Sequence, residues 1–451
     1  MARRLSVLSA HRMKHWFKDQ HFRSLLKNSS YLAVSKVVAA IAQIATMSLA
    51  AHALGLLLLG ALILIDSYAR AVSGIAKFQS WQLIVRYGGR VLHGEHEDFK
   101  TSTGFAFALD AISGVGGMFV ALALLPFIGP WVGIAPDQVW IAMLYCTLLP
   151  TMAAATPTGV LRALDRFDQI SWADTVTPIS RLFAALAVYL LGGGFVAYLA
   201  AWYVTSLAGD LYDWFLAWRE LRRRGLLGGI RPTLKPDSLP GAWRFAIQVN
   251  LTASVQSVWG PIARLTVGGL LGAAGAALFR VASVLSDGAS KPADLLAKAF
   301  YPEVVRMDLS SKKPWKLMLR GTALASGLAL AAILILLVGG KPILSFLFGK
   351  DFLASYDAMV ILMIVPFLSV LSFPLPPMLY ALDRPGGPLK ARLLGTIVYF
   401  LIIAPLCWNL GVNGAAIAIV LANLATVGIM MWQLRHEHRR VRPRKAEPAA
   451  R

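Results

Sequence analysis

The chain has 451 residues, of which 57% are apolar and only 15% are charged, and its mean hydropathy is +0.62. A soluble protein carries roughly 25% charged residues, so this composition excludes a soluble globular domain. The net charge of +21 would indicate nucleic-acid binding in a soluble protein. Here the basic residues gather in short connections between apolar blocks, so no nucleic-acid partner is expected.

The apolar residues form repeated blocks of about 20 residues, the length that crosses a bilayer as a helix. The blocks lack the two-residue alternation of an outer-membrane barrel, so helices are the remaining way to span the membrane. The sequence therefore predicts an all-α polytopic membrane protein with about twelve transmembrane helices. The expected spans are residues 31–53, 55–78, 103–127, 138–160, 171–191, 194–217, 244–270, 273–300, 318–339, 357–380, 391–410 and 413–433.

The lysines and arginines are distributed unevenly between the two sides of this arrangement. Of the 44 basic residues, 33 fall in alternate connections and in the two ends of the chain, whereas the opposite connections hold only Lys341 and Lys350. Cytoplasmic connections carry the excess of basic residues in membrane proteins. The distribution predicts a multi-pass protein with both termini in the cytoplasm.

Three sequence features recur at nearly one offset. The pattern LxALDR ends the fourth span at Asp165-Arg166 and the tenth span at Asp383-Arg384, 218 residues later. Leu-Gly pairs precede the second and eighth spans at an offset of 217, and the sixth and twelfth at an offset of 219. Six spans begin and end on the same side, so the two halves are expected to be parallel repeats around a central cleft.

The repeat and the charge distribution together predict the organisation of the chain. A basic cytoplasmic segment that lies on anionic membrane lipids precedes two six-helix bundles, which a cytoplasmic linker joins and a basic cytoplasmic tail follows. The predicted boundaries are 1–28 for the segment, 29–218 for the first bundle, 219–240 for the linker, 241–435 for the second bundle and 436–451 for the tail.

Charged residues inside predicted spans are the candidate functional residues, because each costs about 2.5–3.5 kcal/mol at the bilayer centre and is expected to face a cavity or a partner. On the eighth span, charges separated by 7, 4, 3 and 4 residues form one helical stripe that includes Arg280, Lys291 and Asp294. The cations predicted to line an anion-binding cavity are Lys36, Arg70, Arg181, Arg264, Arg280 and Lys291. The carboxylates that couple transport or pair with these cations are Asp66, Asp287 and Asp294.

Two interpretations of these charges remain open. Asp66 with Arg70, and Asp287 with Lys291, are spaced to form ion pairs without a functional role. The alternative is a cationic vestibule, since arginine and lysine suit phosphate and pyrophosphate. Tryptophans offer faces for sugars, or form an interfacial belt; they include Trp81, Trp202, Trp214 and Trp259.

Motifs of nucleotide-dependent or enzymatic chemistry are missing from the sequence. There is no phosphate-binding GxxxxGK[ST] loop, no nucleophile–base pattern and no zinc-ligand spacing, so no catalytic residue, metal or cofactor is predicted. Cys146 and Cys407 fall in apolar blocks of opposite halves and imply no disulfide.

With these features the sequence resembles the multidrug/oligosaccharidyl-lipid/polysaccharide exporter superfamily, and within it the bacterial polysaccharide and O-antigen flippases. The residues that carry the resemblance are the Leu-Gly pairs at Gly55 and Gly272, the LxALDR ends, and Tyr301-Pro302-Glu303. The likeness covers residues 29–435. It implies an inner-membrane transporter that moves polyprenyl-pyrophosphate-linked oligosaccharide to the periplasmic leaflet, alongside a polysaccharide polymerase or export complex.

Two other functions remain as alternatives. An ion-coupled small-molecule or drug exporter of the same superfamily commonly has an acidic residue in its first span, where this chain has Lys36. A membrane-embedded glycosyltransferase or ligase needs catalytic residues on a sizeable external loop, and the predicted external loops are short.

Overall fold

In the computed structural model the structure describes residues 20–305, 313–372, 375–381 and 386–441, and within these ranges all regular secondary structure is helical. Most of the predicted basic segment and tail falls on residues 1–19 and 442–451, outside these ranges. The all-helical fold predicted from the apolar blocks is confirmed.

The first half of the chain runs from α2 to α9. Its main helices are α2 (Gln20–Ala76), α3 (Ser80–Gly88), α4 (His96–Ile128), α5 (Val139–Cys146), α6 (Leu149–Met152), α7 (Thr156–Ala163), α8 (Phe167–Leu190) and α9 (Phe195–Arg223). Short 3₁₀ helices connect some of them: η1 (Val91–His93), η2 (Pro130–Val132) and η3 (Pro136–Gln138).

The second half repeats this arrangement with longer continuous helices. Its elements are α10 (Ala242–Val305), α11 (Lys313–Phe348), η4 (Lys350–Ser355), α12 (Tyr356–Leu362), α13 (Ile364–Ser372), α14 (Leu375–Ala381) and α15 (Gly387–Val441).

Sharp glycine bends turn three of the long helices back across the bundle. Gly55 in α2 has φ 66° and ψ −173°, and Gly272 in α10 has φ 72° and ψ −177°. Gly411 in α15 has φ 57°, and its predicted equivalent Gly192, between α8 and α9, has φ 67°. Only glycine adopts these angles without steric cost. The Leu-Gly pairs that mark the sequence repeat are therefore equivalent turns in the two halves.

The bends account for the number of crossings. Among the described residues, five continuous helices are long and apolar enough to span a membrane, and a pair bent by 51° over 136–163 makes a sixth. Three of the five turn back at glycine, and α8, α9 and α11 complete the set, so each half supplies six crossings. The predicted twelve-helix fold with two repeats is confirmed.

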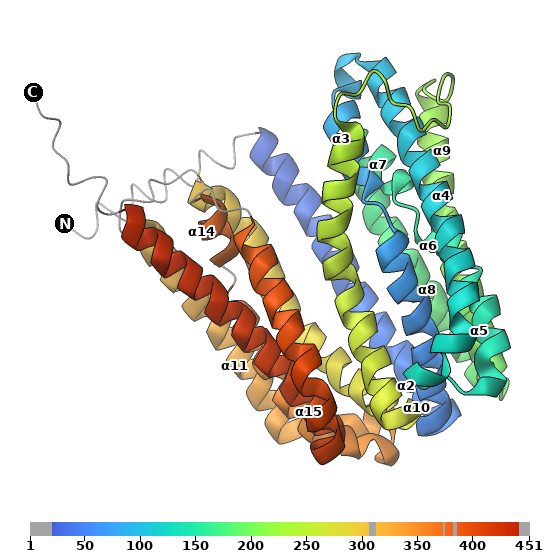
Figure 1. Cartoon of the computed structure of the whole chain (residues 1–451), viewed down its shortest axis with the longest axis vertical. Coiled ribbons are helices and arrows are strands. Elements are labelled where there is room, and N and C mark those ends of the chain that lie inside the picture. Colours follow the sequence, from blue (N-terminus) through green and yellow to red (C-terminus); the bar gives the residue numbers. More distant parts are fainter. Residues whose placement is uncertain (1–19, 306–312, 373–374, 382–385, 442–451) are drawn as a thin grey trace, which may run out of the picture.

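Figure 1 shows how the halves are arranged. Helices α3 to α9 lie on one side, α11, α14 and α15 on the other, and α2 and α10 pack against each other between them. The connections 77–95, 164–166 and 224–241 lie at one end, drawn at the top, which we call the basic end. The glycine bends lie at the opposite end.

At the basic end, the LxALDR motif of the first half forms a turn and ion pairs that connect α8 with α9. Asp165 has φ 58°, which turns the chain between α7 and α8. Arg166 donates hydrogen bonds of 2.9 Å to both Asp168 and Glu220, and Glu220 also accepts one of 2.8 Å from Arg224. The Glu220 side chain is only 2% exposed, so the arginines compensate a buried carboxylate. The second copy, Asp383-Arg384, lies outside the described residues.

A second buried carboxylate fixes the bent fourth crossing. Asp110 on α4 accepts hydrogen bonds from Ser80 Oγ and Thr156 Oγ1 at 2.7 Å, and from the backbone N–H groups of Ala155 and Thr156 at 2.8 Å. The carboxylate thus holds the start of α7 against α3 and α4, and it complements the positive end of the α7 dipole. This cluster supports one wall of the interior without facing it.

Close backbone packing seals the end opposite the basic end. A Cβ placed on Gly268 of α10 would lie 2.6 Å from the carbonyl oxygen of Val132, and one placed on Gly60 would overlap the carbonyl of Ala273. The Ser48 hydroxyl of α2 donates to the carbonyl of Leu347 at the end of α11. The two halves are therefore in direct contact at this end.

Candidate functional site

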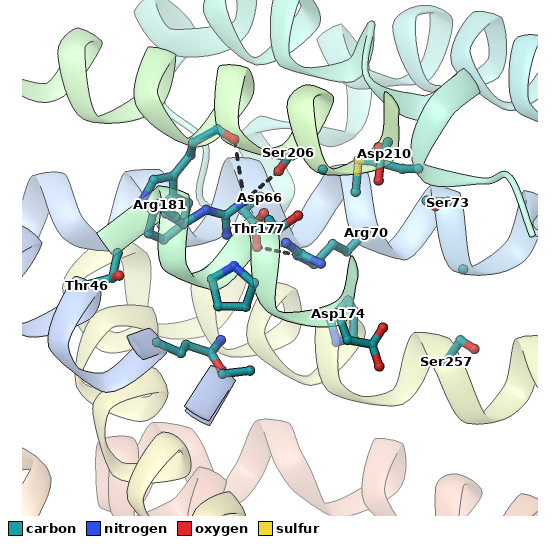
Figure 2. A pocket seen from close by; sticks show the side chains of 18 of the residues that line it. Thr46, Asp66, Arg70, Ser73, Asp174, Thr177, Arg181, Ser206, Asp210 and Ser257 are labelled. Atoms are coloured by element: carbon teal, nitrogen blue, oxygen red, sulfur yellow. Dashed lines mark hydrogen bonds and ion pairs between the residues drawn. The ribbon is translucent and has the colours of Figure 1, made fainter. Parts of the chain in front are cut away.

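A cavity of about 770 Å³ opens among α2, α8, α9 and α10. Most of its lining belongs to the first half, and α10 supplies the facing wall through Ser257, Pro261, Arg264 and Arg280. The first two crossings of each half all contribute residues to the lining, and α8 and α9 contribute as well. Figure 2 shows side chains from these helices converging on the cavity.

Asp66 and Arg70 of α2 form the ion pair that their spacing indicated. Arg70 Nε lies 2.7 Å from Asp66 Oδ2, and Tyr145 donates a hydrogen bond of 3.0 Å to Asp66 Oδ1. The Asp66 side chain is 14% exposed, whereas that of Arg70 is 41% exposed and lines the cavity. The pair leaves Arg70 partly available to a ligand.

Arg181 of α8 reaches across to α9. Its guanidinium donates a hydrogen bond of 2.5 Å to Ser206 Oγ and one of 3.4 Å to the carbonyl oxygen of Trp202. Figure 2 shows this guanidinium beside Asp66. It also lies 5.0 Å from the centre of the Trp202 ring. Neutral groups thus orient this cation, and no carboxylate lies within ion-pair distance among the described residues.

Arg264 and Arg280 bring the second half into the same cluster. Arg264 of α10 donates a hydrogen bond of 2.8 Å to Ser67 of α2, which links the two halves. Arg280 lies past the bend of α10 and forms a 3.7 Å ion pair with Asp287. Asp287 is thus paired with Arg280, seven residues away, and the predicted partner Lys291 lies outside the residues whose side chains the structure describes.

The cavity has an acidic part that the sequence analysis missed. Asp174 of α8 and Asp210 and Asp213 of α9 line it, nearer the basic end than Arg181 (Figure 2 labels Asp174 and Asp210). Asp210 accepts a hydrogen bond of 2.8 Å from Thr151. Asp174 stands seven residues before Arg181, which places both on one helix face and was the available sequence signal.

Five of the six predicted cations line this cavity: Lys36, Arg70, Arg181, Arg264 and Arg280. Asp66 lines it too, and so does Lys77. The side chains of Lys291 and Asp294 lie outside the part of the chain whose side chains the structure describes. The structure thus gathers cations from segments up to 244 positions apart in the sequence, Lys36 to Arg280.

The tryptophans separate into different roles. Trp202 lines the cavity. Trp81 packs under the guanidinium of Arg162 at 3.9 Å, Trp214 packs edge-on against Phe107, and Trp259 packs against Tyr399. Trp202 alone of these four is placed to contact a ligand in the cavity.

Comparison by sequence finds one informative relative. The chain is 38% identical over 348 residues to the inner membrane protein YghQ of Escherichia coli (strain K12), which covers 76% of this chain and 98% of that protein. No family model matches the chain.

Comparison by structure identifies the fold. An inward-facing MATE-family multidrug resistance transporter of the MOP superfamily superposes with a TM-score of 0.65 at 16% identity, over 90% of this chain and 96% of that one. The lipid II flippase MurJ in its inward closed conformation gives 0.67 at 11% identity, over 90% and 87%. The chain has the fold that these transporters share.

The cavity predicts a specific pattern of thiol reactivity. In a Cys146→Ala, Cys407→Ala background, a cysteine at Ser257 is expected to react with a charged methanethiosulfonate at least about tenfold faster than one at Ser102, because reactivity follows exposure. Ser257 lines the cavity, whereas Ser102 is fully buried in α4. Mass spectrometry of the detergent-solubilised protein measures both rates. Equal rates would show that water does not reach the cavity.

Proposed function

We propose a transport function from the premise that the chain belongs to the family of the inner membrane protein YghQ: it is a flippase of the inner membrane that moves an anionic lipid-linked oligosaccharide across the bilayer. The substrate class is a polyprenyl-pyrophosphate-linked oligosaccharide for O-antigen, capsule or exopolysaccharide synthesis. The fold shared with MATE and MurJ transporters supports transport.

The observation that carries the proposal is the cluster of four arginines in one cavity. Arg70, Arg181, Arg264 and Arg280 face a lining in which Asp66 is the carboxylate at their level. Ionised groups are costly in an apolar bundle unless paired, so an excess of cations indicates an anionic ligand. Guanidinium groups form charge-assisted hydrogen bonds to phosphoryl oxygens, which matches a pyrophosphate headgroup.

The same electrostatics supports an orientation and a direction. In this proposal the basic end faces the cytoplasm, because basic connections are retained there. The cavity then admits cargo from the cytoplasmic leaflet, and the polyprenyl tail stays in lipid beside the bundle. A membrane that is negative inside favours outward movement of negative charge by about 2.3 kcal/mol per charge per 100 mV. The flipped product is positioned for a polysaccharide polymerase or export complex in the periplasm.

Transport by this chain requires the two halves to separate at the end that is sealed. The seal consists of backbone contacts through glycine together with the bond from Ser48 to Leu347. Alternating access therefore proceeds by the halves rocking about α2 and α10, the helices that pack between them.

One observation favours a second function. Asp174, Asp210 and Asp213 give the cavity an acidic region of the kind that an ion-coupled exporter of cationic small molecules would use. In that case the carboxylates bind the drug or the coupling ion, and the arginines serve only as counter-charges. The two functions differ in the sign of the transported charge.

The flippase proposal predicts that cavity arginines control transport. Arg181→Gln and Arg264→Gln are each expected to slow flipping of a lipid-diphosphate oligosaccharide in proteoliposomes by at least about tenfold, because a charge-assisted hydrogen bond contributes about 1.5–3 kcal/mol. Arg219→Gln is the matched control, since Arg219 lies over Phe215 outside the cavity. Equal rates for all three variants, at equal reconstitution, would contradict an anion-binding role.

The rocking mechanism predicts that the sealed end must open. Cysteines introduced together at Ser48 and Leu347, in the background without native cysteines, are expected to cross-link on oxidation, because these residues are in contact. The cross-link should stop flipping, and reduction should restore it. Each single-cysteine variant serves as the control. Undiminished flipping by the fully cross-linked protein would mean that this end does not open during transport.

A further inference from the structure

The charges in the cavity are separated into two levels along the helix axes. The first level contains Arg70, Arg181, Arg264 and Arg280 with Asp66, and hydrogen bonds fix its members to one another's helices. Ser206 and Trp202, which accept from Arg181, belong to α9 at the same level. Here four guanidinium groups line the cavity with one carboxylate, Asp66, and Arg280 is also paired with Asp287.

The second level lies closer to the basic end. Asp174 precedes Arg181 by seven residues on α8, about 10 Å at 1.5 Å per residue. On α9, which runs the other way, Asp210 and Asp213 follow Ser206 by four and seven residues in the same direction. Figure 2 shows Asp174 and Asp210 on the side of Arg70 away from Arg181.

The two lysines at this level are fewer than its three carboxylates. Lys77, seven residues beyond Arg70 on α2, donates its hydrogen bond to the carbonyl oxygen of Met152. Three carboxylates thus share the level with Lys36 and Lys77. In the part of the chain that the structure describes, Asp174 and Asp213 take part in no ion pair within 4.0 Å. The lining therefore changes from an excess of positive charge to an excess of negative charge over about two helical turns.

A second feature of the arginine level points to a ligand there. Trp202 lines the cavity and is only 7% exposed, yet its indole Nε1–H has no hydrogen-bond acceptor among the described residues. A buried donor without an acceptor costs about 1–3 kcal/mol. A ligand oxygen beside Arg181 would satisfy it.

We propose that Asp174, Asp210 and Asp213 bind a primary ammonium group on the substrate's saccharide, so that the cavity selects a headgroup whose phosphoryl anion and free amine lie about 10 Å apart. The arginine level holds the diphosphate, and the carboxylates contact an amino sugar one or two residues along the glycan. The arrangement rests on the proposed flippase function and adds the charge pattern of its cargo. An N-acetylated sugar at that position adds no cation to balance the three carboxylates and binds more weakly.

The test uses two matched probes with the full-length protein in detergent. Both are citronellyl-diphosphate disaccharides; one carries a free amino group on its second sugar and the other is its N-acetylated twin. The amine is expected to bind about tenfold more tightly, which corresponds to about 1.4 kcal/mol. In Asp174→Asn/Asp210→Asn/Asp213→Asn the ratio of the two affinities should fall to about one, whereas Asp351→Asn, an exposed residue of η4, should keep it.

The outcomes separate this inference from the function on which it rests. Equal affinity of the twins for the unaltered protein, or an unchanged ratio in the triple variant, overturns the amine site. A sodium or proton dependence that is the same for both twins and disappears in the triple variant also overturns it, because the carboxylates then bind a small cation. Failure of both probes to bind overturns the flippase proposal itself. If the triple variant does not fold, Asp174→Asn alone is measured, since this side chain is exposed.

Discussion

The constraint on which this structure depends is the cost of holding ionised side chains inside an apolar helical bundle. Moving such a group out of water costs several kcal/mol even after local relaxation. The protein meets this cost in two ways. Asp110 and Glu220 are surrounded by donors and become structural. The arginines instead surround a cavity, where hydroxyl and carbonyl groups orient them but leave an excess of positive charge.

In the proposed flippase, this excess links the two halves to the cargo. Arg181 belongs to the first half and Arg264 to the second, and the bond from Arg264 to Ser67 keeps them in one cluster. Without an anion the cations repel one another, and Asp66 offsets only part of the repulsion. A diphosphate between them would draw both halves to one ligand. The site that recognises the cargo is thus also the place where its charge acts on the contact between the halves.

Much of the fold follows from the sequence because membrane spans have a characteristic length and glycine has unusual backbone freedom. The blocks of about 20 apolar residues gave the crossings, and the repeated Leu-Gly pairs marked the bends later found at Gly55 and Gly272. Helix α3 was missed, since nine residues with Leu83 and Ile84 buried are too short for a span. Five cavity cations were predicted because charges are rare in spans.

The carboxylates Asp174, Asp210 and Asp213 were harder to predict as cavity residues than the arginines. A helix that is apolar all round gives little indication of which face meets lipid and which meets protein. Asp210 and Asp213 lie toward the end of the predicted span 194–217, where charges are also tolerated as solvated groups. The packing of α8 against α9 places them on the wall of the cavity. The ion pair of Arg280 with Asp287 agrees with the seven-residue spacing of the predicted stripe, although the predicted partner of Asp287 was Lys291.

The central claim is that this cavity carries a lipid-linked anion across the bilayer. The most direct measurement compares two cargoes in the same proteoliposomes containing the unaltered protein: a fluorescent polyprenyl-diphosphate oligosaccharide and a lipophilic cationic dye. The account predicts that the protein accelerates transbilayer movement of the diphosphate and leaves the dye at its protein-free rate. Accelerated movement of the dye without movement of the diphosphate would contradict it and identify a cation exporter instead.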